Sequence, residues 1–384
     1  ATAGAAAISP ARDPPIQGFG RAPNVTFGYA DFAGSLCAAR SISRCGGGVL
    51  RLQLRVGDRV RVRPLDDILA TLDETGCLDA LPFMPEMARA CGREFVVHRS
   101  AHKVNDLVDR TGLRRMDDAV VLVGERCDGS RHGGCEARCQ SLWKDAWLER
   151  ADAAAPTPPM GRAAGSPGVD TRRRAGCTEQ DLLARCRADA AGGERFICQQ
   201  TELKKASSEL AWWNPRQYFR DWRSGNVAIG DLARAFGFWL FCIVAKRVGG
   251  YRLLVGAYDA IQARRGAPPF PYRDGRLRKT PSQVLNLQPG ERVKVKAFAE
   301  ILETLDTSNK NRGLWFDAEM VRYCGGTYSV LARVQRIIDP KSGQMLRFGT
   351  PSVILDNVTT LGDYHRFYPQ NEYPFWREIW LQRC

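Results

Sequence analysis

The chain has 384 residues, of which 44% are hydrophobic, and lysine plus arginine exceed aspartate plus glutamate by 14. This length predicts two or three domains, and no stretch reaches the roughly 20 apolar residues that span a bilayer, so we expect a cytoplasmic protein without a transmembrane segment. The basic excess favours an anionic partner such as nucleic acid, acidic lipid or a phosphorylated metabolite, but an arginine-rich solvated surface explains it equally well.

Residues 1–55 form an N-terminal extension to which we assign no fold, because they show no clear hydrophobic period and no apolar core of a signal peptide. A first module, residues 56–150, follows with a mainly β pattern. Its predicted elements are strands at Arg59–Arg63, Phe95–Val97 and Ala119–Val123, a short helix at Asp66–Leu72 and a helical turn at Met84–Ala90.

The middle of the chain has a different composition. Residues 151–177 are rich in alanine, proline, glycine and arginine, which is typical of a flexible linker. Residues 178–270 have a helical pattern, in which Asp231–Lys246 is apolar enough for a buried helix and Tyr251–Arg265 is amphipathic. A basic connector, residues 271–288, then leads to a second module.

The second module, residues 289–384, repeats segments of the first at a constant offset of 233 residues. The matched segments are Gly57–Val62 with Gly290–Val295, Ile68–Asp73 with Ile301–Asp306, Phe83–Gly92 with Phe316–Gly325, Ala119–Leu122 with Ser352–Leu355, and Leu142–Arg150 with Phe375–Arg383. Five matches at one spacing indicate an internal duplication. The opening G-D-R-V-R-V resembles the first strand of small SH3-like barrels. The sequence therefore predicts an α+β protein: two homologous, mainly-β, SH3-like barrel modules joined by a helical middle region.

The first module carries a cluster of potential metal ligands. Four of them fall within thirteen residues: Cys127, His132, Cys135 and Cys139. Thiolate and imidazole ligands suit a zinc ion, whereas three cysteines with a fourth from elsewhere suit an iron–sulfur cluster. Cys91 is the first candidate for an outside ligand and Cys198 the second. We expect a bound zinc ion, and an iron–sulfur cluster is the alternative. The interpretation without a metal is that the cysteines are ordinary buried thiols.

In the second module the positions of Cys127, His132, Cys135 and Cys139 become Thr360, His365, Tyr368 and Glu372. Only the histidine is retained. Whether the second module keeps any site around His365, Tyr368 and Glu372 is left open by the sequence.

Both modules also share the element Glu-Met-x-Arg-x-x-Cys-Gly, at Glu86–Gly92 and Glu319–Gly325. A buried glutamate at its start can act as a general acid or base, although most glutamates of this kind are exposed or paired with arginine. The methionine and cysteine, four residues apart, are soft ligands suited to copper, but core packing is the stronger interpretation.

The segment Trp212–Arg223 interleaves tryptophans with arginines. Such a pattern can stack bases and neutralise phosphates, or lie at a membrane interface. We favour a third interpretation, in which the tryptophans are buried against the modules. Nucleic-acid binding therefore remains possible but not favoured.

The motifs L-P-F-M-P-E-M, R-C-D-G-S-R-H-G-G-C, W-K-D-A-W-L, W-R-E-I-W-L and W-W-N-P-R-Q-Y resemble an uncharacterised, mostly actinobacterial family found beside biosynthetic genes. The resemblance implies a biosynthetic setting and no particular reaction. We expect a metalloenzyme that acts on an unidentified small molecule or protein, with catalytic residues unassigned. The alternative is a non-catalytic, zinc-stapled scaffold that binds a protein or a nucleic acid.

Overall fold

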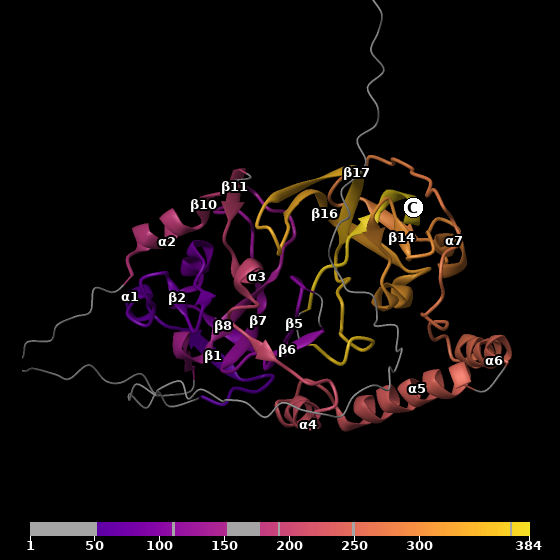
Figure 1. Ribbon diagram of the computed structural model, residues 1–384, viewed down its shortest axis with the longest axis horizontal. Coiled ribbons are helices and arrows are strands. Elements are labelled where there is room, and N and C mark those ends of the chain that lie inside the picture. Colours follow the sequence, from indigo (N-terminus) through magenta and orange to yellow (C-terminus); the bar gives the residue numbers. More distant parts are fainter. Residues whose placement is uncertain (1–51, 110–111, 152–176, 191–192, 248–249, 369–370) are drawn as a thin grey trace, which may run out of the picture.

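The computed structural model describes residues 52–109, 112–151, 177–190, 193–247, 250–368 and 371–384 (Figure 1). The predicted N-terminal extension and the predicted linker lie almost wholly outside these ranges. The described residues combine helices with antiparallel sheets, in agreement with the α+β class.

The first module is built on a five-stranded antiparallel sheet with the order β8-β7-β4-β1-β9. Its strands are β1 (Arg59–Val62), β4 (Glu94–Ser100), β7 (Ala119–Arg126), β8 (Gln140–Lys144) and β9 (Leu148–Arg150). Between them lie α1 (Leu65–Leu69), β2 (Cys77–Leu78), β3 (Leu81–Pro82) and the 3₁₀ helices η1 (Pro85–Ala90) and η2 (Asp145–Trp147). The strands, short helix and helical turn expected in this module are confirmed, with small differences in length.

The second module has a five-stranded sheet with the order β18-β17-β16-β13-β19. Its strands are β13 (Arg292–Val295), β16 (Thr327–Ile338), β17 (Met345–Leu355), β18 (Trp376–Arg377) and β19 (Leu381–Arg383). The intervening elements are α7 (Phe298–Leu302), β14 (Lys310–Asn311), β15 (Leu314–Trp315), η3 (Ala318–Tyr323) and η4 (Glu378–Trp380). Figure 1 shows the two modules side by side.

The two sheets also agree in register. The pair Val60 and Phe95 corresponds to Val293 and Tyr328, each displaced by 233 residues. The other shared pairings obey the same offset: Val97–Leu122 with Val330–Leu355, Val60–Arg150 with Val293–Arg383, and Val120–Trp143 with Val353–Trp376. Because a slip of one residue would turn every side chain to the opposite face, equal registers place equivalent residues on equivalent faces.

Each module has its own apolar core. In β1 the alternation of arginine and valine buries Val60 and Val62 and leaves the arginines toward solvent. Two apolar positions that the modules share are buried in both: Leu72 with Leu305, and Phe83 with Phe316. Phe83 meets Trp147 edge to face at 5.2 Å between ring centroids, and Phe316 meets Trp380 at the same distance. Such pairs add to the stabilisation from area burial.

Neither sheet closes within the described residues, because no pairing joins β8 to β9 or β18 to β19. The SH3-like barrel expected from the sequence is therefore not confirmed. What the structure shows is an open five-stranded sheet in each module, with a helical turn before its last strand.

The middle region is less helical than expected. Its helices are α2 (Glu179–Arg185), α3 (Gln199–Glu202), α4 (Arg216–Arg223), α5 (Ile229–Arg247) and α6 (Tyr251–Arg264), but it also contains the strands β10 (Arg187–Ala190), β11 (Gly193–Phe196) and β12 (Ser208–Glu209). β10 and β11 form a hairpin with few β-branched residues, so its sequence carries little strand signal. β12 extends a small sheet of the first module formed by β5 (Lys103–Asn105) and β6 (Leu113–Arg115).

Helix α5 exists as expected, but the prediction that it is buried is wrong. Ala245 is its only fully buried residue, and Phe236 is 62% exposed. The prediction that the tryptophans at 212–222 are buried is also wrong, since Trp213 is 69% exposed. The apolar residues of α5 lie on more than one face of the helix, and the rest of the protein packs against only one of these faces. Within the described residues, no helix has the length and apolarity needed to cross a bilayer.

Candidate metal centre

The cysteine-rich segment forms a tight loop between β7 and β8. The amide of Cys127 donates to the carbonyl oxygen of Cys139 at 2.9 Å, which closes the loop. Inside it, the amides of His132 and Gly134 both donate to the carbonyl oxygen of Gly129. Gly129 has a φ of 70°, and a Cβ on it would overlap the carbonyl group of Cys135. A glycine is therefore needed here, and the turn that it allows brings His132 back toward Cys127.

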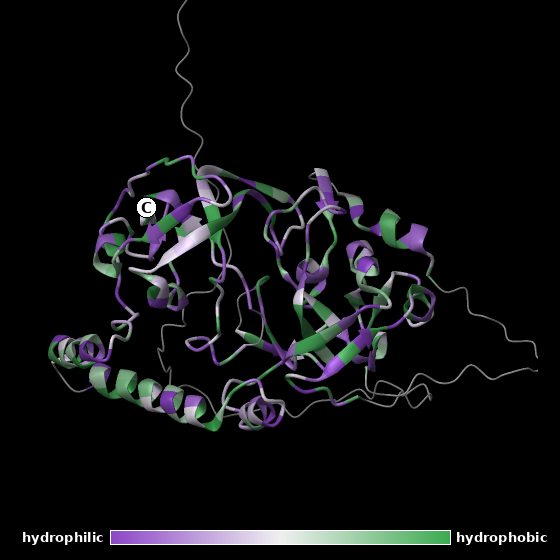
Figure 2. Ribbon diagram, turned by 180° about the vertical axis from the view of Figure 1, so that it is seen from behind, coloured by the Kyte–Doolittle hydropathy of each residue, from purple (hydrophilic) through white to green (hydrophobic). Residues whose placement is uncertain are grey.

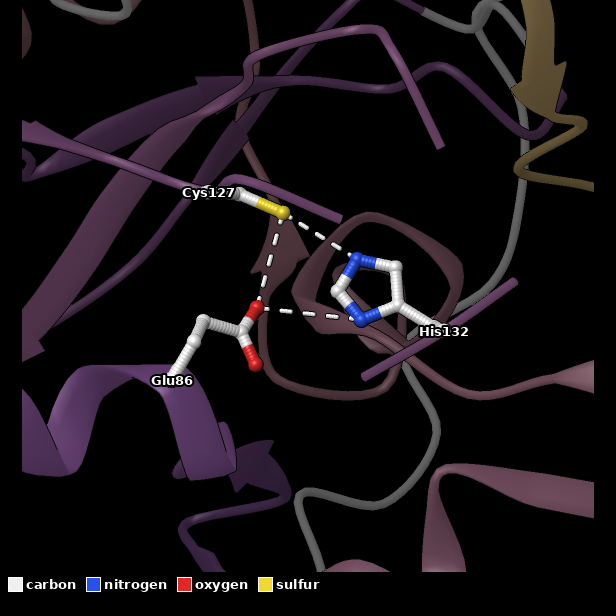
Figure 3. Close-up of side chains that lie close together, drawn as sticks. All are labelled: Glu86, Cys127 and His132. Atoms are coloured by element: carbon white, nitrogen blue, oxygen red, sulfur yellow. Dashed lines mark hydrogen bonds and ion pairs between the residues drawn. The ribbon is translucent and has the colours of Figure 1, made fainter. Parts of the chain in front are cut away.

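The 3₁₀ helix η1 presents Glu86 to this loop. Met87 and Ala90 of η1 are buried in the first core and fix the position of the helix. Glu86 itself is only 7% exposed, and its carboxylate points at the loop (Figure 3). A carboxylate in this position has lost most of its hydration, so it requires a hydrogen-bond donor or a cation as partner.

Glu86, Cys127 and His132 lie in contact with one another (Figure 3). The Cys127 sulfur is 3.1 Å from Nε2 of His132 and 3.5 Å from Oε1 of Glu86, and Nδ1 of His132 is 3.7 Å from the same oxygen. One ligand atom from each residue falls within 4.8 Å of the other two. Sulfur, nitrogen and oxygen donors at this spacing can hold a single metal ion.

Burial decides the charge state of the group. It raises the pKa of the Cys127 thiol well above its usual value, and the charge of Glu86 adds to the effect. Burial also lowers the pKa of His132, although Glu86 acts in the opposite direction. Without a cation the thiol is therefore protonated and the imidazole neutral at pH 7. A bound metal ion reverses this for the thiol, because thiolate is the form that ligates.

The group borders a cavity of about 90 Å³ between the two modules and the middle region. Besides Glu86, Cys127 and His132, the residues that line it include Cys135, Cys139, Cys198, Gln199, Gln200 and Glu372. Four cysteines therefore line one cavity. The cavity is large enough for an ion with several water molecules, or for a small ligand.

Cys135 and Cys139, both expected as ligands, lie outside the three-residue group. The Cys135 sulfur accepts a hydrogen bond from the amide of Ile338 at 3.4 Å, and Cys135 belongs to the core of the second module. Cys139 lines the cavity without bringing its sulfur to the contact shared by the group. Cys91, the expected outside ligand, packs instead against the first core and does not border the cavity.

The second module contributes Glu372 to the same cavity. Burial raises the pKa of this carboxyl group, and the positive charge of Arg126 opposes that rise. Glu372 occupies the position that corresponds to Cys139, but it faces the site of the first module. Alignment of the two modules marked Glu372 as the residue equivalent to Cys139. It gave no sign that the Glu372 side chain lines a cavity beside the first module.

The corresponding loop of the second module has the same backbone turns without the thiols. The amide of Thr360 donates to the carbonyl oxygen of Glu372 at 2.8 Å, and that of His365 donates to Gly362 at 2.9 Å. His365 does not face a thiol, because its Nε2 lies 2.9 Å from a carboxylate oxygen of Asp317. Tyr368 fills the remaining space and donates from its hydroxyl to Thr360 at 3.0 Å.

The sequence predicted Cys127 and His132 as metal ligands and placed Glu86 among candidate acids and bases, and the structure brings the three together. The signal that links Glu86 to the site is its recurrence as Glu319, whose carboxylate accepts hydrogen bonds from the amides of Leu361 and Tyr364 in the second loop. In both modules the glutamate of the 3₁₀ helix thus meets the histidine-bearing loop. Comparison of the sequence with known protein families and with curated proteins finds no match.

Proposed function

We propose that this protein is a metalloenzyme that binds one zinc ion through Glu86, Cys127 and His132. The observation that carries the proposal is the convergence of three different donor atoms within 4.8 Å at the edge of a cavity. Three protein ligands with a fourth position open to water or substrate are typical of catalytic zinc, whereas structural zinc has four protein ligands. Bound zinc supplies a Lewis acid and an activated water molecule.

The surrounding residues support a catalytic role for the cavity. The side chain of Gln199 is held by the carbonyl groups of Pro82 and Leu142, so it is a fixed part of the wall. Glu372 is protonated more readily than an exposed carboxyl group because it is buried, and it can donate or accept a proton beside the ion. The cavity has a volume of about 90 Å³ and accommodates a small substrate or a narrow group of a larger one.

An iron–sulfur cluster is the alternative occupant. It would draw on Cys127, Cys135, Cys139 and Cys198, all of which line the cavity. The thiolates of a cluster are shared among two or four irons, so the sulfurs need not all approach one another as closely as they do around one ion. We favour zinc because the atoms in mutual contact are one sulfur, one nitrogen and one oxygen.

The contacts also resemble those of a cysteine nucleophile with a histidine base and an orienting carboxylate. Such a nucleophile requires a depressed thiol pKa. Burial and the charge of Glu86 raise the pKa of Cys127. This environment favours a cation at the site over a free nucleophilic thiolate.

A zinc-stapled scaffold is the second function that we consider. It requires a closed set of four ligands, and Cys139, which lines the same cavity, is our candidate for the fourth. The resemblance to the actinobacterial family adds a biosynthetic setting to the enzyme proposal. The eleven cysteines that the structure describes are all free thiols, which supports a reducing compartment such as the cytoplasm.

The agreement of the two sheets in strand order and register supports an origin by duplication. We also propose that each module is an opened relative of the SH3-like barrel. The five-stranded order and the 3₁₀ turn before the last strand, η2 or η4, support that relationship.

Metal analysis and absorption spectra of protein purified without oxygen test the proposal. We expect one zinc ion per chain and a colourless protein. Cys127→Ser and His132→Ala should each lower zinc affinity by more than about a hundredfold, because even changes behind the ligands cost about 10–100-fold. Both variants should fold, since the second module keeps the same loop turns without thiols.

Cys324→Ser is the matched control, because this half-buried thiol lies in the second module and should leave the zinc content unchanged. Unchanged zinc in both ligand variants would disprove the assignment. A brown protein that loses its colour on Cys135→Ser and Cys198→Ser would establish the iron–sulfur alternative instead.

A further inference from the structure

Helices α4, α5 and α6 lie along one edge of the molecule (Figures 1 and 2), and none of their residues lines the cavity. They carry most of the large apolar side chains that remain exposed among the described residues. Those exposed by 40% or more are Phe219, Trp222, Ile229, Phe236, Trp239, Leu240, Val244, Leu253, Ile261 and, just before α4, Trp212 and Trp213. An apolar surface of this extent marks an interaction site.

The exposed residues of α5 form one stripe. Phe236, Leu240 and Val244 follow one another at intervals of four residues, and the ring of Trp239 lies 5.4 Å from that of Phe236. Residues at this spacing share a helix face. Figure 2 shows α5 as a largely hydrophobic helix at the border of the molecule.

The opposite face of α5 is held by the protein. Phe238 packs against the rings of Phe270 and Tyr364, and Phe241 stacks on Tyr258 of α6 at 5.2 Å. The aromatic cluster fixes the helix, so its outer stripe stays exposed in a defined orientation. The stripe is therefore a feature of the folded protein and does not result from a loosely attached helix.

The charge around the stripe is strongly positive. Residues 211–266 contain nine arginines and lysines and three aspartates. Asp221 is buried against Lys103, Asp231 pairs with Arg234, and Asp259 pairs with Arg273. The exposed basic side chains include Arg216, Arg223, Lys246, Arg247, Arg252 and Arg264. A partner that covers this surface must accept both apolar side chains and positive charge.

Other parts of this chain do not meet that requirement. Residues 1–51 contain five arginines and two aspartates, and residues 152–176 contain four arginines and two aspartates. A second copy would bring the same positive surface. Like charges disfavour all three as occupants. A nucleic acid matches the charge but gains little from aliphatic side chains such as Leu240 and Leu253.

We propose that α4, α5 and α6 attach the protein to the surface of an anionic lipid bilayer. The tryptophans and aliphatic side chains enter the interface between headgroups and acyl chains, and the arginines and lysines contact lipid phosphates. The helices lie in the plane of the bilayer and do not cross it. This proposal is independent of the proposed metal centre, because none of the residues that line its cavity belongs to α4, α5 or α6.

Co-sedimentation with vesicles tests the proposal directly. The full chain should bind vesicles that contain phosphatidylglycerol and bind vesicles of pure phosphatidylcholine at least about tenfold more weakly. The double variant Phe236→Glu, Leu240→Glu should lose about tenfold or more of the binding to anionic vesicles, because both side chains leave the interface and add negative charge. Both positions are exposed, so the substitutions should not disturb folding.

Val123→Glu is the matched control, since Val123 is 53% exposed on β7 of the first module. It should bind anionic vesicles as the unmodified chain does. Absence of vesicle binding, or binding that the double variant retains, would overturn the proposal. Two other results would also overturn it if the chain does not bind vesicles. One is a dimer, detected by light scattering, that the double variant abolishes, and the other is RNA binding that the double variant abolishes.

Discussion

The loop of each module carries one histidine, and the two histidines have different partners. The equivalent positions of the two sites are Met84 and Asp317, Glu86 and Glu319, Cys127 and Thr360, and His132 and His365. In the second module Asp317 holds His365 by an ion pair, and this charge raises the pKa of His365 to about 9 in spite of its burial. In the first module methionine stands in place of the aspartate, and burial lowers the pKa of His132.

This difference explains why we assign a metal ion to only one module. A protonated imidazole has no lone pair for a metal, and a neutral one does. His365 carries its own positive charge at neutral pH and satisfies the acidic residues around it. His132 is neutral, so its ring can offer a lone pair, and Glu86 and the Cys127 thiol lie beside it. The second module thus holds an internal ion pair, and the equivalent group of the first module is the one that we propose binds a metal ion.

The largest effect is expected from removing the ion pair of the second module. Asp317→Asn leaves His365 buried without its counter-charge and should lower the free energy of unfolding by about 3 kcal/mol. Urea unfolding at pH 6 measures this change. Asp356→Asn, at an exposed residue, is the control and should change stability by less than about 0.5 kcal/mol. A similar small effect from both substitutions would show that the ion pair contributes nothing.

The pH dependence of the same variant sharpens the test. The pKa of His365 is raised in the folded state, so its contribution is complete below its ordinary value of 6.5 and is lost as pH rises through about 9. The pKa of Asp317 is lowered, so its contribution is present above 3.8 and is lost as the pH falls below that value. The stability difference between the unmodified chain and Asp317→Asn should therefore be largest between pH 4 and 6.5. A difference that grows from pH 7 to pH 10 would contradict the charge assignment.

Introducing the equivalent of Asp317 into the first module should make its histidine resemble His365, which is protonated, and so weaken metal binding. Met84→Asp places a carboxylate where Asp317 lies in the second module, which favours protonation of His132 and competes with the metal. Zinc affinity should fall by about tenfold or more, since each unit of histidine pKa shift corresponds to 1.4 kcal/mol. Competition with a coloured chelator measures the affinity. Met84→Leu preserves volume and should retain zinc, and an equal loss in both variants would attribute the effect to packing.

The smallest effect is expected at Cys91, which the sequence suggested as a ligand. Cys91→Ser should leave the zinc content unchanged, because this side chain packs on the first core and does not border the cavity. The free energy of unfolding of this variant should fall by about 1 kcal/mol, as is usual when a polar side chain replaces a half-buried one. Loss of zinc from this variant would mean that the ligand set differs from the one described.

Much of the fold follows from the sequence because the pattern of each strand is local and repeated. The alternation in Arg59–Val62 recurs in Arg292–Val295, and both segments are strands with the same buried valines. The hairpin β10–β11 was not predicted, because its pairing partners and its contact between Phe196 and Gly343 are set by tertiary packing. The exposure of α5 was not predicted either, since an apolar helix gives no sign of which face remains uncovered.

The site was predictable in part. The spacing of Cys127 and His132 allows a tight turn, and glycines at 129, 133 and 134 accept the positive φ that it requires. The sequence did not distinguish Cys135, whose neighbour Ile338 lies in the other module. Nor did it show that Glu372 crosses to the first site. These contacts join residues about 200 or more positions apart, and no local pattern records them.

X-ray absorption at the zinc edge of the metal-loaded protein tests the central claim most directly, because it counts the sulfur atoms bound to the ion. We expect one sulfur at about 2.3 Å, with the remaining ligands nitrogen or oxygen at about 2.0–2.2 Å. The sulfur contribution should disappear in Cys127→Ser and remain in Cys135→Ser. A first shell of three or four sulfurs would contradict the account, since it would place the ion among Cys135, Cys139 and Cys198 and leave Glu86 and His132 without a role in binding.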